Sequence, residues 1–426
     1  INVFNTGLAQ GFASILPKPG QCFCVVQELP ATEPEAKVKL LQPEKWGVGS
    51  IADAIFQQIE AFPLRDIEEI LVIGHDIHTG VLAIDCAKQL KGRWPRGTRV
   101  RSVVISHMSY LEYARRKGQA LTEVLSKSRD QHEIVASADH AFAVGPLLAN
   151  SFQGARNEHN DRVIALTPGA ADIQAGPEKA DSLTFYIGGR LGLEDDTIKN
   201  GVLSVRAVIA AYEAERTNGH AGRWTTRGHF YACGVDPEKD AELLTLLKRD
   251  AQKNAMFVIE SIPFSDKQDE VHEHLARSDV AIMPSWHEGF GLTGWEAICA
   301  GVPLVCSSQS GLALLIDQLR RTLADADFHS IEAVQLSGGA PAGMPTASDV
   351  EALSNALRAV VADYPKRKRA ALALALRIKR HFTWERCAEE LIAPFKWPWA
   401  NAADWHQRQQ AAERFGRLVA AQGGPL

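Results

Sequence analysis

The sequence lacks the features that mark secreted, membrane-spanning and nucleic-acid-binding proteins. Its seven cysteines are scattered, odd in number and without a C-x-x-C pair, which argues against a disulfide framework and favours a reducing cytoplasm. No apolar run reaches the roughly 18 residues that a membrane span needs, and no signal peptide is visible. The net charge of −5 gives no reason to expect nucleic acid as a partner. There is also no P-loop and no G-x-S-x-G elbow.

Two short basic clusters stand out against this balance, at residues 115–117 (Arg-Arg-Lys) and 366–369 (Lys-Arg-Lys-Arg). Each is either a solvated helix face or a patch that attracts an anionic lipid or acceptor. Peripheral contact with a membrane therefore stays open, although no membrane span is expected. The chain begins with Ile1 rather than Met, which also leaves open a preceding leader or a further domain.

The length and the order of the apolar runs predict two domains. A chain of 426 residues exceeds what one hydrophobic core usually serves. Short apolar strands alternate with helical patterns in two successive blocks, so we expect an α/β protein with two Rossmann-like, doubly wound parallel sheets that face a cleft. Residues 170–181, which are rich in Ala, Pro, Gly and charge, predict a linker between the blocks.

The same patterns predict individual elements. We expect a loop over residues 30–43, helices over 81–90 and 111–128, and a poorly defined segment before residue 48. The strands expected in the first block cover residues 21–27, 70–73, 100–106, 134–136, 141–144 and 163–166, and those in the second cover 183–187, 229–233, 256–259, 280–283 and 304–306.

The most informative stretch covers residues 279–305. An apolar strand ends at Pro284, a polar and Gly-rich loop follows over 285–291, and a helix begins near Leu292. Such a unit aims free backbone N–H groups and the positive end of a helix at an anion. This stretch therefore predicts a phosphate-binding loop.

Two carboxylates bracket that loop. Glu288 lies on the loop itself, and Glu296 lies about one turn into the helix. A carboxylate can accept two hydrogen bonds from vicinal hydroxyls, as in dinucleotide-binding folds. One acid at each end of a phosphate-binding loop suits a ligand with a sugar at each end of its diphosphate, which is the shape of a nucleotide sugar.

Residues 288–305, E-G-F-G-L-T-G-W-E-A-I-C-A-G-V-P-L-V, resemble the E-x-F-G-x-x-x-x-E-A-x-A-x-G-x-P-V-V hallmark of retaining GT-B glycosyltransferases. These family 4-like enzymes include glycogen and sucrose-phosphate synthases and mannosyl- and N-acetylglucosaminyl-transferases. The resemblance implies a metal-independent, retaining hexosyltransferase that uses a nucleotide-diphosphate sugar as a substrate and needs no cofactor. UDP is the expected base, with GDP and ADP as alternatives, and the acceptor (glycan, lipid, protein or small molecule) is unidentified.

The resemblance also implies roles for the loop residues. In the family the first glutamate contacts the donor sugar and the second the ribose hydroxyls, which assigns Glu288 to catalysis and Glu296 to substrate binding. Main-chain N–H groups of the loop hold the sugar and phosphate, and here these belong to Phe290, Gly291, Leu292 and Thr293.

A second motif lies earlier in the same block. Gly188-Gly189-Arg190-Leu191 resembles the family's V-G-R-L, and Lys199-Asn200 its K-N, although the gap between Arg190 and Lys199 is longer here. In the family the Arg and Lys take up the charge that departure of the nucleoside diphosphate leaves on the β-phosphate. Arg190 and Lys199 are therefore expected to be catalytic, with Gly189 beside the substrate.

The first block carries three further matches. The hexapeptide 75–80, H-D-I-H-T-G, resembles the H-D-W-H-T-G of starch and glycogen synthases and implies substrate contacts for Asp76 and His78. His107 follows the next strand, where the family has a histidine beside the donor sugar, and is expected to orient the reacting centre. Residues 46–53 resemble a glycine loop whose helix start faces the donor phosphates, which implies a contact for Gly49.

Two remaining resemblances set the domain limits. Residues 167–172 are similar to the family's P-N-G-V-D interdomain segment, and residues 382–385, F-T-W-E, are similar to the F-S-W-E that precedes a last helix crossing back to the first domain. We therefore expect an acceptor-side domain at 1–172, a nucleotide-sugar-binding domain at 173–385 and a returning helical segment at 386–426.

Other interpretations remain open. His75, Asp76 and His78 would suggest a metal, but no cysteine or further histidine lies nearby, so no metal site is expected. Asp325-Ala-Asp327 spells a D-x-D, which we interpret as a solvated turn. The alternative functions are a non-catalytic GT-B module that binds a nucleotide or glycan, and an epimerase-like or pseudo-glycosyltransferase enzyme on the same scaffold.

Overall fold

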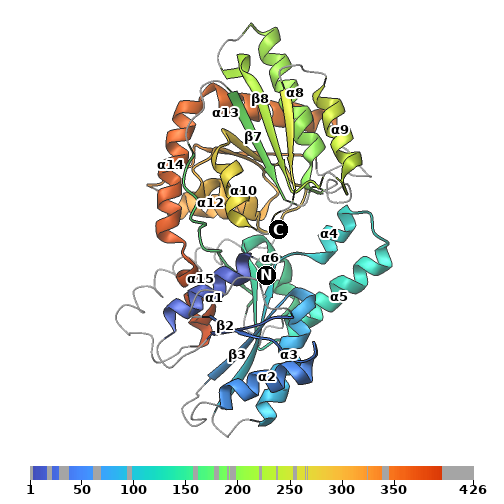
Figure 1. The fold of residues 1–426 in the computed structure, drawn as a ribbon, viewed down its shortest axis with the longest axis vertical. Coiled ribbons are helices and arrows are strands. Elements are labelled where there is room, and N and C mark those ends of the chain that lie inside the picture. The colour runs from blue at the N-terminus through green and yellow to red at the C-terminus, as the bar shows by residue number, and fades with distance from the viewer. Residues whose placement is uncertain are drawn as a thin grey trace. The chain divides into compact units, whose positions relative to one another are not determined.

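The computed structural model describes most of the chain as two units. The described residues are 3–16, 22–27, 38–60, 69–93, 98–156, 162–176, 182–189, 191, 198–219, 223–236, 238–252, 257–263, 265, 267–323, 325–337 and 345–395. Unit 1 comprises residues 1–110, 125–169 and 382–426, and unit 2 comprises residues 111–124 and 170–381. Figure 1 shows the helices and strands of each unit.

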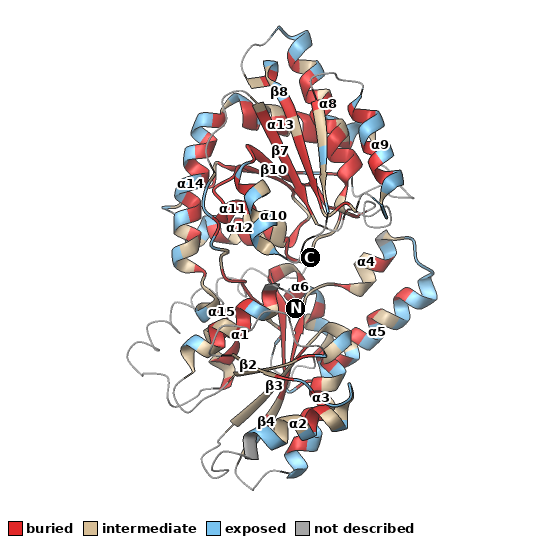
Figure 2. Cartoon of the chain, in the orientation of Figure 1, coloured by how far each residue is buried: buried red, intermediate tan, exposed pale blue. Residues whose placement is uncertain are grey.

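Unit 2 is built on a parallel sheet of six strands in the order β12-β11-β10-β7-β8-β9. Nearly every residue of β7, β10 and β11 is buried, as expected for strands covered on both faces (Figure 2). The strands are β7 (Ser182–Gly188), β8 (Arg227–Cys233), β9 (Phe257–Ile262), β10 (Val280–Met283), β11 (Leu304–Ser307) and β12 (Ile331–Val334).

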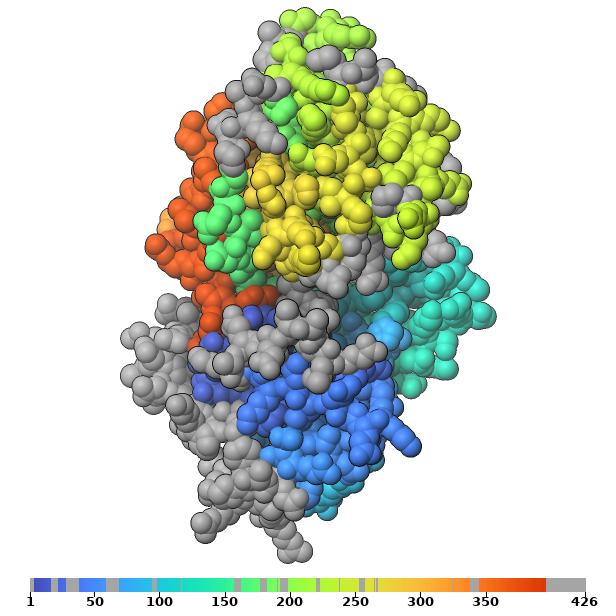
Figure 3. Space-filling view, in the orientation of Figure 1, coloured from blue at the N-terminus to red at the C-terminus, as the bar shows by residue number. Residues whose placement is uncertain are grey.

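Helices cover this sheet and complete its core. Helix α8 packs against both α9 and α13, and α11 packs against α14. On the face shown in Figure 3, α9 and its neighbours form much of the surface of unit 2. The α-helices are α8 (Gly201–Thr217), α9 (Ala241–Ala251), α10 (Gln268–Ala276), α11 (Leu292–Cys299), α12 (Gly311–Thr322), α13 (Ala347–Ala362) and α14 (Tyr364–His381), with a 3-10 turn η3 (Arg223–Thr225).

Unit 1 contains a parallel sheet in the order β3-β4-β5-β6 and a separate parallel pair, β1-β2. Its strands are β1 (Cys22–Val25), β2 (Val38–Leu41), β3 (Glu69–His75), β4 (Arg99–Ser106), β5 (His140–Val144) and β6 (Ile164–Leu166). Its helices are α1 (Val3–Ile15), α2 (Val48–Glu60), α3 (Asp76–Arg93), α5 (Leu121–Ser137), α6 (Pro146–Phe152) and α15 (Trp384–Ile392), with 3-10 turns η2 (Gln153–Ala155) and η4 (Ala393–Phe395). Helix α4 (Tyr110–Arg116) begins at Tyr110, the last residue of the first segment of unit 1, and its other residues belong to unit 2.

The α/β class and the parallel sheets are confirmed, and several expected elements are wrong. The strand expected at residues 134–136 is the last part of α5, where Ile134 and Val135 are buried on the inner face of a helix. The single helix expected over 111–128 is two helices, because Gly118 adopts a left-handed φ of 67° between them. The loop expected over 30–43 contains β2, and the poorly defined start contains α1.

Some sequence expectations lie outside the described residues. The described part of the expected linker, residues 170–176, has no helix or strand. The structure does not describe the last part of the expected returning segment, residues 396–426. No helix among the described residues combines the length and the apolar character that crossing a bilayer requires.

Helix α1 is held against α15 by a close approach at two glycines. Phe4, Leu8 and Phe12 form a buried stripe along α1 at helical spacing. A Cβ at Gly7 would lie 2.1 Å from the ring of Trp384, and one at Gly11 would lie 2.2 Å from the main-chain oxygen of Trp384. The F-T-W-E motif therefore places its tryptophan where only glycine fits on α1.

We predict that Gly11→Ala destabilises the protein by about 1–3 kcal/mol, because the methyl group pushes α1 away from a main-chain atom that cannot yield. Gly92→Ala is the matched control, since a Cβ at Gly92 in α3 would meet no atom within 4 Å. That change should be neutral or stabilising by up to about 1 kcal/mol through helix propensity. Urea unfolding measures both; equal stability of the two variants would contradict this packing.

Candidate functional site

The phosphate-binding loop predicted from the sequence lies in unit 2 between β10 and α11. Strand β10 ends at Met283 and α11 begins at Leu292, so the strand, loop and helix fall where the sequence predicts them. Gly291 is the N-cap of α11 with φ 101°, a conformation that L side chains rarely adopt. A Cβ there would also lie 2.8 Å from Cε of Met283. The glycine is thus required both by the backbone and by the space around it.

Neighbouring segments hold the loop backbone in place. The N–H of Trp286 donates to the carbonyl of Ile198 at 3.0 Å, and the N–H of Gly311 donates to the carbonyl of Glu288 at 2.8 Å. A Cβ at Gly311 would lie 1.9 Å from the carbonyl oxygen of Gly289. Main-chain contacts therefore preorganise the loop.

The first turn of α11 presents donor groups. The backbone N–H groups of Leu292, Thr293 and Gly294 make no hydrogen bond to any residue that the structure describes. Unsatisfied N–H groups and the helix dipole together favour an anion at this end. Phe290 contributes only main chain here, because its side chain is buried against Trp295 with ring centroids 5.9 Å apart.

The other end of α11 is held by a buried lysine. Lys368 Nζ donates to the carbonyl of Gly301 at 2.9 Å, and Lys368 is only 9% exposed. A cation at a helix C-terminus stabilises the helix dipole. Its neighbour Arg367 is buried as well, on Glu332 and the carbonyl of His329. Arg367 and Lys368 are therefore structural and not part of a surface cluster, whereas Lys366 and Arg369 are exposed.

Glu288, Lys199 and Gly189 come together at the point where the sheet reverses its strand order. The chain runs outward from β7 to β9 and then returns to place β10 on the other side of β7, and such switch points are where parallel sheets bind ligands. Lys199 Nζ contacts the Glu288 carboxylate, with both side chains about one-fifth exposed. A Cβ at Gly189 would lie 3.5 Å from Cε of Lys199.

Asn200, the residue after Lys199, has a strained backbone conformation. It adopts φ 62°, caps the start of α8 and is 1% exposed. Its side-chain amide donates to the carbonyl of Pro284 at 2.8 Å, which ties the segment carrying Lys199 to the start of the phosphate-binding loop. Non-glycine residues in this region cost free energy and persist where the surroundings hold them, often at functional sites.

Glu296 has a neighbour that sequence reasoning missed. His272 on α10 places Nε2 3.7 Å from Oε1 of Glu296, and both side chains are about 15% exposed. No described residue forms a hydrogen bond with that Nε2. No sequence motif marks His272, since its place beside Glu296 arises from the packing of α10 on α11.

Two of the first block's candidates, Asp76 and His107, lie beside His75 at the carboxyl ends of β3 and β4 in unit 1. His75 is the last residue of β3, Asp76 begins α3, and His107 follows β4. Asp76 Oδ1 accepts the backbone N–H of His107 at 2.9 Å, and Asp76 adopts φ 46°. His78 lies one turn on, exposed, with Nε2 3.1 Å from the hydroxyl of Tyr110.

The remaining candidates are placed as follows. Gly49 lies in the first turn of α2, where an added Cβ would meet no atom within 4 Å. Arg190 lies outside the described residues. Asp325 pairs with Arg377 and Asp327 accepts the backbone N–H of His329, so the D-x-D is occupied by protein groups. The described residues contain no cluster of three or more His, Cys, Asp or Glu side chains suited to a metal ion.

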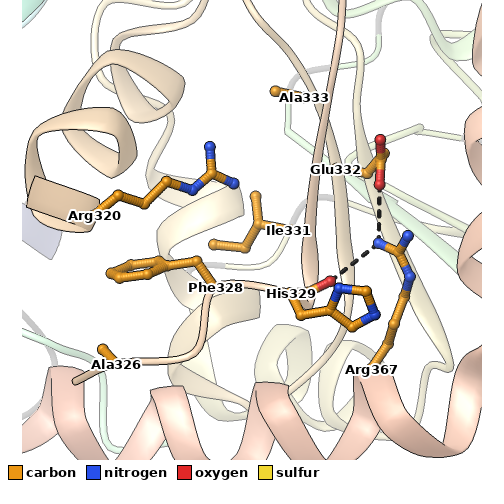
Figure 4. A pocket seen from close by; sticks show the side chains of 8 residues that line it. All are labelled: Arg320, Ala326, Phe328, His329, Ile331, Glu332, Ala333 and Arg367. Atoms are coloured by element: carbon orange, nitrogen blue, oxygen red, sulfur yellow. Dashed lines mark hydrogen bonds and ion pairs between the residues drawn. The ribbon is translucent and has the colours of Figure 1, made fainter. Parts of the chain in front are cut away.

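A cavity of about 570 Å³ lies elsewhere in unit 2, between the end of α12, β12 and α14 (Figure 4). Arg320 and Phe328 line one side and Glu332 and Arg367 the other. Its charges are paired, with Arg367 2.9 Å from Glu332 and Arg320 3.0 Å from Asp317. None of the candidate residues lines it, so we assign it no role in the reaction.

Burial shifts three pKa values at the end of β3. It lowers the pKa of His75 to about 4, and burial together with the nearby His75 lowers that of His107 to about 3. Burial raises the pKa of Asp76 to about 6, although the backbone hydrogen bond from His107 acts in the opposite direction. Both histidines are therefore neutral in the folded protein near pH 7.

These shifts predict how stability depends on acid. The histidines take up protons in the unfolded state near pH 6.5 but in the folded state only near pH 4 or below, so their stabilising contribution is lost as the pH falls from 6.5 towards 4. Asp76 is protonated first in the folded state, so it opposes that loss between pH 6 and about 4. Each uncompensated proton is worth about 1.4 kcal/mol per pH unit.

We predict that His75→Asn loses less unfolding free energy than the wild type between pH 7 and 4.5, and that Asp76→Asn loses more. Each difference should be about 1 kcal/mol or larger. Chemical denaturation at several pH values measures the slopes, and the comparison between variants cancels the titration of the other carboxylates. Parallel slopes for all three proteins would contradict these shifts.

Two curated proteins are similar to parts of this chain. The D-inositol 3-phosphate glycosyltransferase of Stackebrandtia nassauensis is 33% identical over 126 residues, which is 30% of this chain and only about a quarter (24%) of that relative's length. A GDP-mannose-dependent alpha-(1-6)-phosphatidylinositol dimannoside mannosyltransferase of Mycobacterium tuberculosis is 26% identical over 313 residues, or 71% of this chain and 69% of that protein.

Solved structures share the fold at low identity. Sucrose-phosphate synthase from Thermosynechococcus elongatus aligns over 91% of both chains with a TM-score of 0.59 and 14% identity. Anabaena HepE, solved in complex with UDP and glucose, aligns over 92% of this chain and 95% of its own with a TM-score of 0.60 and 11% identity. The model of the family described as "Family 4 Glycosyltransferase in conflict systems" matches residues 1–391. The chain therefore belongs to this family of glycosyltransferases and has their GT-B fold.

Proposed function

We propose that this protein is a retaining, metal-independent hexosyltransferase that takes a hexosyl group from a UDP-sugar and gives it to an acceptor hydroxyl. One observation carries the proposal: the N–H groups that open α11 and the Lys199–Glu288 pair lie together at the switch point of the unit 2 sheet. This combination offers donors for a diphosphate beside a carboxylate for sugar hydroxyls.

Lys199 and Glu288 can serve a nucleotide sugar while remaining paired. An ammonium group has three N–H donors, so Lys199 can bind Glu288 and a phosphate oxygen at the same time. An ionised carboxylate has several acceptor positions, which leaves Glu288 free to accept from a sugar hydroxyl. The pair thus connects the sugar end of the donor to its phosphate end, and Arg190 is proposed to assist at the phosphate by resemblance alone.

The proposed reaction is a front-face displacement. The bond between the anomeric carbon and the phosphate oxygen breaks, and its electron pair leaves on the β-phosphate. The acceptor oxygen forms its bond on the same face, and its proton passes to the departing phosphate oxygen. The N–H groups of Leu292, Thr293 and Gly294 and the charge of Lys199 are proposed to stabilise the developing negative charge, which is usually the largest part of such catalysis.

Two of the similar proteins bear on the choice of nucleotide base. HepE was solved with UDP and glucose, whereas the mannosyltransferase relative is GDP-mannose-dependent by name. We propose UDP as the base, and the acceptor belongs to a glycan, lipid, protein or small molecule. We further propose a cytoplasmic location, since all seven cysteines are free thiols, as a reducing compartment favours.

The proposal is tested by binding and transfer together. Calorimetry with UDP, GDP and ADP should show UDP binding, and UDP-glucose turnover should persist in EDTA. We predict that Glu288→Gln and Lys199→Met each lower turnover at least about 100-fold with the thermal midpoint unchanged, because each removes stabilisation of the transition state.

Glu332→Gln is the matched control, since Glu332 is likewise a partly exposed carboxylate paired with a cation, Arg367, but lies at the separate cavity. It should leave turnover unchanged. If GDP binds and UDP does not, GDP replaces UDP as the proposed nucleotide. Failure to bind any of the three diphosphates, or full turnover by Glu288→Gln, would contradict the proposed function.

A further inference from the structure

His75 and His107 form a direct contact between the ends of two neighbouring strands. Strands β3 and β4 pair in parallel with His75 opposite Ile105, so the two histidines leave the same edge of the unit 1 sheet. Nδ1 of His75 lies 2.8 Å from Nε2 of His107, and the ring centroids are 5.0 Å apart at 46°. This is hydrogen-bond distance between the two rings.

A hydrogen bond between two neutral imidazoles couples their tautomers. Each ring carries one N–H, so the pair has four tautomer combinations, and only two of them place one proton between Nδ1 of His75 and Nε2 of His107. If His75 donates, His107 carries its proton on Nδ1. If His107 donates, its Nδ1 is an acceptor. The protonation state of Nδ1 on His107 is therefore coupled to that of His75.

The surroundings hold both rings for this contact. The backbone N–H of His75 donates to Thr79 Oγ1 at 2.6 Å. A Cβ at Gly74 would lie 2.3 Å from the carbonyl oxygen of Thr79, so the turn is closed too tightly for a larger residue. The ring of His107 meets the edge of Phe4, with centroids 4.9 Å apart at 85°. His107 is thus held at its main chain by Asp76, at Nε2 by His75 and at its ring by Phe4.

We propose that His75 is a positioning residue for glycosyl transfer, which holds the ring of His107 through its Nε2 and leaves Nδ1 as the nitrogen that meets a hydroxyl of a sugar substrate. The inference rests on the proposed function, because that function supplies the sugar. Within the described residues Nδ1 of His107 has no hydrogen-bond partner. Either state of the pair suits a hydroxyl, which both donates and accepts.

This role differs from that of its neighbour Asp76. Asp76 acts on the main chain of His107, whereas His75 acts on its ring. Without His75, the ring of His107 loses its hydrogen bond at Nε2 and can rotate, so the sugar would be bound but misaligned. Misalignment of a bound substrate lowers kcat more than it raises KM.

The test compares His75→Leu with His75→Asn. The amide of Asn lies close to the position of Nδ1 and can keep the hydrogen bond, whereas Leu has a similar volume and no polar atom. We expect His75→Leu to lower kcat about 10- to 100-fold, as loss of an orienting partner does at metal-bound histidines. KM should stay within about threefold of the wild-type value. His75→Asn should recover most of the rate.

The second readout does not depend on activity. Ring ¹⁵N shifts of His107, assigned with His107→Gln, should report a hydrogen-bonded Nε2 in the wild type and in His75→Asn, and loss of that hydrogen bond in His75→Leu. His132→Leu is the control, because His132 bonds the carbonyl of Ser128 within α5 and packs against Phe152. It should change neither the rate nor the shifts. If His75→Leu does not fold, His75→Gln, whose amide lies one bond further out, takes its place.

Unchanged kcat or unchanged His107 shifts in folded His75→Leu would overturn the proposal. Equal losses in the Asn and Leu variants, accompanied by lower thermal midpoints, would also overturn it, since they indicate a structural role alone. Absence of transfer by the wild type would contradict the proposed function instead. The ring shifts would then still decide whether His75 holds Nε2 of His107 in a hydrogen bond.

Discussion

The constraint on which the site depends is the start of α11, where three backbone N–H groups lack partners among the described residues. Such an end is stable only if the surrounding backbone is held, because unpaired donors otherwise draw the loop towards other acceptors. Gly291 allows the turn, and main-chain bonds at Trp286 and Glu288 hold the loop. Lys368 then satisfies the far end of the same helix. Preorganised donors of this kind need no rearrangement when charge develops in a reaction.

Each unit carries one strained residue beside its candidate groups. Asp76 in unit 1 and Asn200 in unit 2 are the non-glycine residues with left-handed φ among those the structure describes. Asp76 accepts a hydrogen bond from the backbone N–H of His107. Asn200 donates one to the carbonyl of Pro284, and this bond holds the segment that carries Lys199. In both cases a polar side chain bonds across to a neighbouring strand end, which stabilises a backbone conformation that would otherwise be disfavoured.

The sequence predicted the parts whose information is local. The phosphate-binding loop was predictable because an apolar strand, glycines and a helix start follow one another within residues 279–305. Helix α1 was not predicted, and the reason for glycine at positions 7 and 11 of that helix is contact with Trp384, more than 370 residues away. The contacts His75–His107 and His272–Glu296 join elements that are distant in the sequence, so no motif spacing marks them.

A crystal structure of the protein with UDP bound would test most directly whether the start of α11 binds the diphosphate. We expect the diphosphate oxygens to accept hydrogen bonds from the N–H groups of Leu292, Thr293 and Gly294, with the ribose hydroxyls on Glu296. A nucleotide bound elsewhere, for instance in the cavity beside Arg320 and Arg367, with no contact to α11, would contradict it.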